Sequence, residues 1–83
     1  MILKLFTQQN CTKSPAAKQL VKDIEHKVQA EYHDLGTVNG LAEALYYNIL
    51  LTPSIIMLNH DNEIIGHWNG EVPTLEMINK IIK

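Results

Sequence analysis

The chain has 83 residues, of which 46% are hydrophobic, a formal net charge of −2 and one cysteine. This length supports a single domain, residues 1–83, that buries about 60% of the surface its unfolded form exposes. The hydrophobic content suffices for a core and argues against general disorder. A single cysteine excludes an internal disulfide and any zinc site built from two or more thiolates.

Charge and hydropathy argue against two classes of partner. The basic residues are all lysines and form no run, so the clustered positive charge that binds nucleic acid is missing. No apolar stretch approaches the roughly 20 residues of a membrane span, so we expect neither nucleic acid nor a membrane as partner. The first residues carry no secretory signal, which makes a reducing cytoplasm the expected compartment. No feature of the sequence indicates oligomerisation, and a monomer is expected.

The first part of the chain predicts a strand, a helix and a second strand. Residues 2–7 are a short, mostly apolar run with the length and composition of a buried strand. Residues 14–27 predict an amphipathic helix, because apolar residues recur there every three or four positions. The apolar positions of this pattern are Ala17, Leu20, Val21, Ile24 and Val28. Residues 28–33 then alternate between apolar and polar, which is typical of a strand with one polar face.

The remainder predicts a helix, a hairpin and a final helix. Asn39 is expected to cap the second helix. The apolar side of that helix is expected to comprise Leu41, Ala42, Ala44, Leu45 and Ile49. Residues 54–58 predict a central strand, which a four-residue loop at 59–62 connects to a partner strand at 63–68. Thr74 is expected to cap the last helix, and one of Tyr46 and Tyr47 is expected to pack beneath the second helix.

The order of elements is therefore strand, helix, strand, helix, strand, strand, helix. The first strand–helix–strand unit needs a right-handed crossover, so its two strands should be parallel. The final hairpin is antiparallel. These connections predict an α/β fold with a four-stranded mixed sheet and three flanking helices.

Cys11 is the residue whose position most suggests chemistry. It follows a predicted buried strand and precedes a predicted helix, where unpaired N–H groups and the helix dipole favour a thiolate. Lys13 would add a cation nearby. A buried structural cysteine is the alternative interpretation, because free cysteines are often buried.

Thr52 and Pro53, directly before the predicted central strand, are the second signal. Pro53 could simply separate a helix from a strand. Alternatively, a cis peptide bond at this position would turn the backbone of Thr52 toward a neighbouring loop, where a substrate strand could pair with it.

Together with the order of elements, these residues resemble the thioredoxin/glutaredoxin superfamily in its minimal, glutaredoxin-sized form, over nearly the whole chain. The matching pieces are the strand at residues 3–7 leading to Cys11, the quartet from Cys11 to Ser14, Thr52-Pro53 before the third strand, and Gly70 before the last helix. The resemblance implies a thioredoxin fold with a helix that begins near Cys11.

The resemblance also implies roles for these residues. Cys11 would be the nucleophile, with Thr12 beside it in the quartet and Ser14 at the position of the resolving cysteine. Thr52 and a cis Pro53 would form the substrate groove, and Gly70 would leave space beside it. The expected partners are a disulfide-containing protein and a thiol reductant or reductase.

Ser14 departs from the pattern, because a serine hydroxyl forms no disulfide and cannot release a mixed disulfide. The serine could be an engineered replacement that traps the adduct, the protein could be a natural monothiol enzyme, or the chain could be a non-catalytic interaction domain. Ser14 followed by Pro15 could also serve as an ordinary helix cap. A monothiol glutaredoxin that binds glutathione or an iron–sulfur cluster is a further alternative.

Metal and cofactor sites are not indicated by the sequence. The four histidines are scattered without the i,i+4 spacing of helical ligands, and no phosphate-binding glycine loop is present. We therefore expect neither a metal nor a cofactor.

Overall fold

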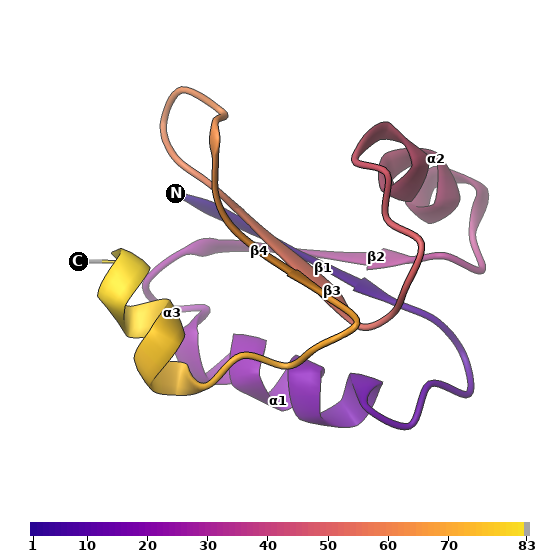
Figure 1. Ribbon diagram of the computed structural model, residues 1–83, viewed down its shortest axis with the longest axis horizontal. Helices are drawn as coiled ribbons and strands as arrows, with labels where there is room; N and C mark the ends of the chain where they lie inside the picture. Colours follow the sequence, from indigo (N-terminus) through magenta and orange to yellow (C-terminus); the bar gives the residue numbers. More distant parts are fainter. Residues whose placement is uncertain (83) are drawn as a thin grey trace.

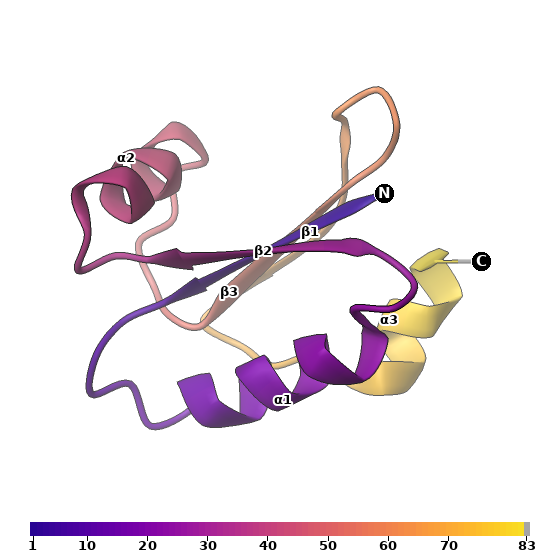
Figure 2. The same ribbon diagram turned by 180° about the vertical axis from the view of Figure 1, so that it is seen from behind.

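Four strands form one mixed sheet, with two helices on one face and a third helix on the other (Figures 1 and 2). The computed structural model describes residues 1–82. In chain order the elements are β1 (Ile2–Thr7), α1 (Ser14–Ile24), β2 (Gln29–Asp34), α2 (Val38–Tyr46), β3 (Ser54–Leu58), β4 (Ile64–Asn69) and α3 (Leu75–Ile82). The strand order is β2-β1-β3-β4. β1 is parallel to β2 and antiparallel to β3, and β4 is antiparallel to β3. The predicted α/β class, with its four-stranded mixed sheet and three helices, is confirmed.

The two central strands supply side chains to both faces of the sheet. Leu3 and Leu5 of β1 lie with Met57 of β3 in the larger core, beneath α1 and α3. Phe6 and Ile56 belong to a smaller core beneath α2. No helix within residues 1–82 combines the length and the hydropathy that a membrane crossing requires.

The bounds of α1 correct two expectations. The helix begins at Ser14, with Lys13 at the N-cap and Pro15 in its first turn, and so starts three residues after Cys11 rather than at it. It ends at Ile24 rather than at residue 27, because the backbone N–H of Lys27 donates to the carbonyl of Ile24 at 2.8 Å and closes a tight turn. β2 accordingly starts at residue 29 rather than 28.

The start of α2 also differs from the prediction. Thr37, not Asn39, is the cap: its hydroxyl accepts the N–H of Gly40 at 3.0 Å and donates to the carbonyl of Asp34 at 2.8 Å. Gly40 permits this packing, since a Cβ there would lie 1.9 Å from the Asp34 carbonyl oxygen. The first turn of α2 therefore lies directly on the end of β2.

The apolar side predicted for the second helix is confirmed in part. Ala44 and Ile49 are buried, whereas Leu41 and Leu45 are 45% and 61% exposed. Within α2 itself only the small residues Gly40 and Ala44 are buried. Tyr47, just after α2, packs edge-on against Phe6 with ring centroids 6.3 Å apart, and Tyr46 is exposed. The expectation that one of these two tyrosines packs beneath the helix is confirmed.

The hairpin between β3 and β4 has a longer loop than predicted. The backbone N–H of Asn59 donates to the carbonyl of Glu63, and the Asn59 side chain accepts the N–H groups of Asp61 and Glu63. These bonds extend the loop to residue 63 and start β4 at residue 64. Thr74 caps the last helix as expected, with its hydroxyl 3.2 Å from the N–H of Met77.

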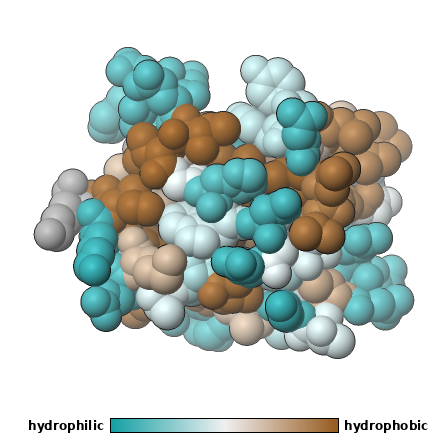
Figure 3. Space-filling view, in the orientation of Figure 1, coloured by the Kyte–Doolittle hydropathy of each residue, from teal (hydrophilic) through white to brown (hydrophobic). Residues whose placement is uncertain are grey.

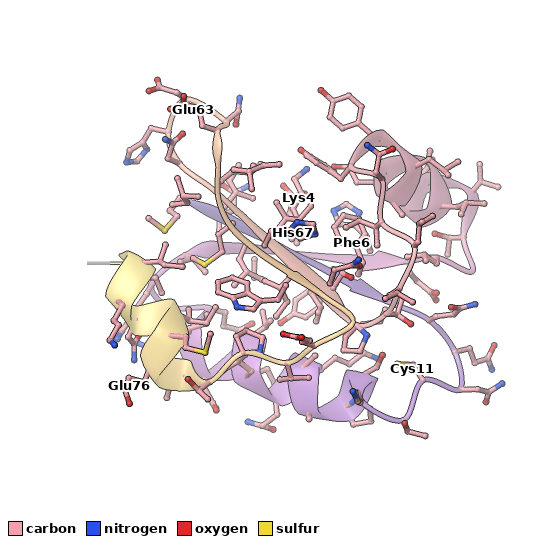
Figure 4. The ribbon with its side chains drawn as sticks, viewed as in Figure 1. Lys4, Phe6, Cys11, Glu63, His67 and Glu76 are labelled. Atoms are coloured by element: carbon pink, nitrogen blue, oxygen red, sulfur yellow. The ribbon has the colours of Figure 1, made fainter. Side chains whose placement is uncertain are left out.

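A charged cluster connects β1, β2 and α2 on the less covered face. The ammonium of Lys4, a residue only 9% exposed, bonds the carboxylates of Glu31 and Glu43 and lies 5.3 Å from the centre of the Tyr47 ring. Figure 4 shows Lys4 between the sheet and α2. His33 stacks on Phe6 at 5.1 Å and lies 3.0 Å from Glu31. Lys4 therefore helps to fix α2 over the sheet.

The ion pairs shift the pKa values of both kinds of group. Burial disfavours the charge on Lys4, but its bonds to Glu43 and Glu31 outweigh this effect and raise its pKa. Burial likewise opposes the charge on Glu31, but hydrogen bonds from His33 and Lys4 lower its pKa. A carboxylate with a lowered pKa stabilises the fold above its ordinary value of 4.5, and this contribution is lost as the pH falls through the folded-state pKa.

We expect Lys4→Met to lower the free energy of unfolding by about 2 kcal/mol at pH 7, because two partly buried carboxylates would lose their cation. Chemical denaturation measures the change. The difference from wild type should shrink below pH 4.5, where protonation removes the repulsion.

Lys80→Met is the matched control. Lys80 pairs with Glu76 at 3.8 Å on the exposed side of α3, so its removal should cost at most about 0.5 kcal/mol. Equal losses for the two variants would contradict the role given to Lys4.

Candidate functional site

The end of β1 and the start of β3 lie side by side, and this places the candidate site. Phe6 of β1 is paired with Ser54 of β3 in the antiparallel ladder. The chain leaving β1 therefore passes the segment that enters β3. Cys11 lies on the first of these segments, close to the start of α1 (Figure 4).

A tight turn sets the position of Cys11. Asn10 adopts a positive φ of 67°, and the backbone N–H of Cys11 donates to the carbonyl of Gln8 at 3.2 Å. The carbonyl of Cys11 in turn accepts the N–H of Ser14 at 3.3 Å. The thiol is partly exposed, which argues against a purely structural, buried cysteine.

Several donors lower the pKa of Cys11 from 9.0 to about 7. The largest contribution comes from the hydroxyl of Ser14 and the next from the hydroxyl of Thr52. Burial opposes the shift, and the backbone N–H groups of Lys13 and Ser14 add to it. A substantial fraction of the Cys11 side chains is therefore in the thiolate form at neutral pH.

The hydroxyl of Ser14 is buried and makes no hydrogen bond within residues 1–82. The residue is 4% exposed, and its Oγ has no hydrogen-bond partner among residues 1–82. A buried hydroxyl without a partner is unfavourable. Ionisation of the neighbouring sulfur supplies the missing acceptor, which explains why Ser14 contributes most to the lowered pKa of Cys11.

Thr52, Pro53 and Gly70 form the other side of the site. The peptide bond between Thr52 and Pro53 is cis. Gly70 donates its N–H to the carbonyl of Pro53 at 2.9 Å. Its positive φ of 76° favours glycine, and a Cβ at this position would lie 3.1 Å from Cδ1 of Leu51. Gly70 therefore lets the loop before β3 lie close against the end of β4.

The other two residues of the quartet contribute less through their side chains. Lys13 is exposed and acts on Cys11 through its backbone N–H, not through the cation expected from the sequence. Thr12 is also exposed, and no hydrogen bond in the described part of the chain connects its side chain to Thr52. The site that the fold assembles thus consists of Cys11, Ser14 and Thr52, with Pro53 next to Thr52 in the loop and Gly70 bonded to the Pro53 carbonyl.

The histidines are mostly exposed, but His33 belongs to a cluster that the sequence did not predict. Ligand atoms of Glu31, His33 and Glu43 lie within 4.8 Å of one another. The Lys4 ammonium contacts both carboxylates and so already balances their charge. We therefore describe this cluster as an ion-pair network.

The sequence also does not predict the role of a buried serine at the start of β3. Ser54 is fully buried and bonds the carbonyl of Leu51 at 2.6 Å. Its only signal is its place directly after Pro53, which does not distinguish a bonded serine from a small core residue.

Comparisons with known proteins agree with this geometry. No family model matches the chain. A thioredoxin from Methanocaldococcus jannaschii is 32% identical over 85 residues, which span 98% of this chain and 91% of that relative.

Solved structures share the fold at lower identity. A structure described as that of a malarial protein has a TM-score of 0.81 at 14% identity and covers 98% of this chain and 91% of its own. Thioredoxin 1 from the thermophilic eubacterium Thermosipho africanus TCF52B has a TM-score of 0.71 at 18% identity, with coverages of 98% and 90%. With the thioredoxin relative, the shared fold establishes that this chain belongs to the thioredoxin/glutaredoxin superfamily of thiol–disulfide oxidoreductases.

Proposed function

We propose that this protein performs thiol–disulfide exchange on protein substrates, with Cys11 as the nucleophile and no internal resolving thiol. The observation that carries the proposal is the partly exposed Cys11 thiol, whose pKa is lowered to about 7 by the Ser14 and Thr52 hydroxyls. Thiolates, not thiols, attack disulfides, so a cysteine with this pKa is reactive at neutral pH.

The proposed reaction has two steps. The Cys11 thiolate attacks one sulfur of a substrate disulfide, so that a bond forms between the two sulfurs and the substrate S–S bond breaks. The released substrate sulfur leaves as a thiolate and takes up a proton. Because Ser14 has no sulfur, an external thiolate must attack the substrate sulfur of the mixed disulfide. A bond forms between these two sulfurs, and the bond to Cys11 breaks and releases the Cys11 thiolate. A small thiol or a protein reductase would supply it.

An apolar surface beside the site supports a protein as substrate. Figure 3 shows hydrophobic side chains gathered over α2 and the loop that follows it. The exposed members nearest to Thr52 in sequence are Leu50 and Leu51, which are 82% and 55% exposed. A large exposed apolar patch is typical of a protein interaction surface. We propose that a substrate segment lies along Thr52 and covers these leucines.

The pH dependence of alkylation tests the activation of Cys11. The rate should rise with pH through a midpoint near 7 in the wild type, and Ser14→Ala should move this midpoint upward because the largest stabilising donor is lost. Lys13→Met keeps the backbone N–H and should move the midpoint less than Ser14→Ala. The opposite order would show that the lysine charge, not the serine hydroxyl, lowers the pKa.

The missing resolving thiol predicts a persistent adduct. Incubation with a disulfide-containing peptide should add the mass of one peptide thiol to the wild-type protein, detected by intact-mass spectrometry, and an added small thiol should remove it. Ser14→Cys should release the peptide without added thiol, because the new cysteine can attack the mixed disulfide.

Two controls complete the adduct experiment. Ser14→Ala should keep the adduct, since it too lacks a resolving sulfur, and Cys11→Ser should form none. A wild-type protein that forms no adduct at neutral pH would contradict the proposed exchange.

A second candidate function is partner binding without electron transfer, which the exposed apolar surface favours. In that case Cys11→Ala should bind a partner as tightly as the wild type. The exchange mechanism instead predicts that stable capture of a disulfide-containing partner requires Cys11. A pull-down followed by elution with a thiol distinguishes the two.

A further inference from the structure

Ser54 is the centre of a buried polar cluster behind the site. Its Oγ lies 2.6 Å from the carbonyl oxygen of Leu51 and 2.9 Å from the side-chain oxygen of Asn69. It also accepts the backbone N–H of Gly70 at 3.3 Å, an N–H that bonds the Pro53 carbonyl at 2.9 Å. The hydroxyl therefore joins the loop before β3 to the end of β4.

The protons of this cluster can be assigned from its distances. A hydroxyl carries one proton and can donate to only one oxygen. The 2.6 Å contact assigns that proton to the carbonyl of Leu51. The contact with Asn69 is then satisfied when the amide group is turned so that its NH₂ donates to Ser54.

The cluster restricts the position of Thr52, which lies between the two loop residues, Leu51 and Pro53, that the cluster contacts. Ser54 fixes the carbonyl of Leu51, and Gly70 fixes the carbonyl of Pro53. The backbone is thus held on both sides of Thr52, whose hydroxyl is the second of the two side-chain groups that lower the pKa of Cys11. No side-chain hydrogen bond within residues 1–82 holds Thr52 itself in place, so its position depends on the backbone on either side.

We propose that Ser54 is a positioning residue, which anchors the loop 51–53 to the end of β4 and thereby holds the Thr52 hydroxyl beside the sulfur of Cys11. This inference rests on the proposed role of Cys11 as the nucleophile. It adds a buried residue, outside the quartet and without contact to substrate, on which the reactivity of that cysteine depends.

The decisive variant is Ser54→Ala, measured by the pH midpoint of Cys11 alkylation in the free protein. A hydrogen bond of ordinary net strength corresponds to a pKa change of roughly 0.7 pH unit. Ser54→Ala should therefore raise the midpoint by about 0.7 and lower the thiolate fraction at pH 7 about threefold. A purely structural role for Ser54 would lower the melting temperature and leave the midpoint near 7.

A double-mutant cycle tests whether Ser54 acts through Thr52. Thr52→Val should raise the midpoint by itself, and Ser54→Ala should then add no further shift. Ile56→Val is the matched control, because Ile56 is buried in the same strand, in the core beneath α2, and takes part in none of the cluster's hydrogen bonds. Its midpoint should equal that of the wild type.

Asn69→Ala keeps the proposal testable if Ser54→Ala does not fold. Asn69 is exposed, so its removal weakens the cluster without opening the core, and the midpoint should rise by less than 0.7. An unchanged midpoint in a folded Ser54→Ala protein, or in Asn69→Ala if that is the variant that folds, would overturn the proposal. So would equal shifts from Ser54→Ala in the wild-type and Thr52→Val backgrounds.

These outcomes are separate from those of the proposed function. The midpoint is measured without a disulfide substrate, so a failure of the Ser54 proposal leaves the adduct experiment unaffected. Conversely, a wild-type protein that forms no adduct would contradict thiol–disulfide exchange, whatever Ser54 does to the midpoint.

Discussion

A negative charge on the sulfur of Cys11 is the condition on which the chemistry of this protein depends, and the fold provides its donors from two distant segments. Ser14 and the backbone N–H groups come from the start of α1, and Thr52 comes from the loop before β3. The antiparallel pairing of β1 with β3 makes this possible, because the end of one strand lies beside the start of the other. Neither segment alone gives the site its full set of donors.

The uneven covering of the sheet determines which surface surrounds this site. α1 and α3 bury the larger core, whereas α2 covers the other face with a glycine and an alanine. Such small residues bury little apolar area, and the Lys4 ion pairs help to hold α2 in place. The leucines of α2 and of the following loop remain exposed, and the last of them, Leu51, directly precedes Thr52.

The period of the hydrophobic residues predicts much of the fold, and the local errors of that prediction have physical causes. The order of elements, the parallel first pair and the antiparallel hairpin are predictable, because each strand and helix has a clear pattern and few connections satisfy them. The apolar side of α2 is predictable only in part: Ala44 and Ile49 are buried as expected, but periodicity does not show that small residues, not Leu41 and Leu45, face the sheet. The cap at Thr37 depends on the contact of Gly40 with Asp34, which no local pattern reveals.

The candidate site was only partly predictable for a similar reason. Cys11, Ser14, Thr52, Pro53 and Gly70 stand out by their place in the motif, and the fold brings them to one end of the sheet. The contribution of Lys13 through its backbone depends on the conformation of the turn that follows Cys11. The cluster around Ser54 depends on contacts between the loop before β3 and the end of β4. Sequence position identifies which residues can react, whereas tertiary contacts set how readily they do so.

The central claim is that Cys11 is a thiolate in a substantial fraction of the molecules at neutral pH. An NMR titration of the Cys11 Cβ resonance in the reduced wild-type protein observes this ionisation directly. The account predicts a midpoint near 7. A midpoint near 9, the ordinary value for a cysteine thiol, would contradict this claim.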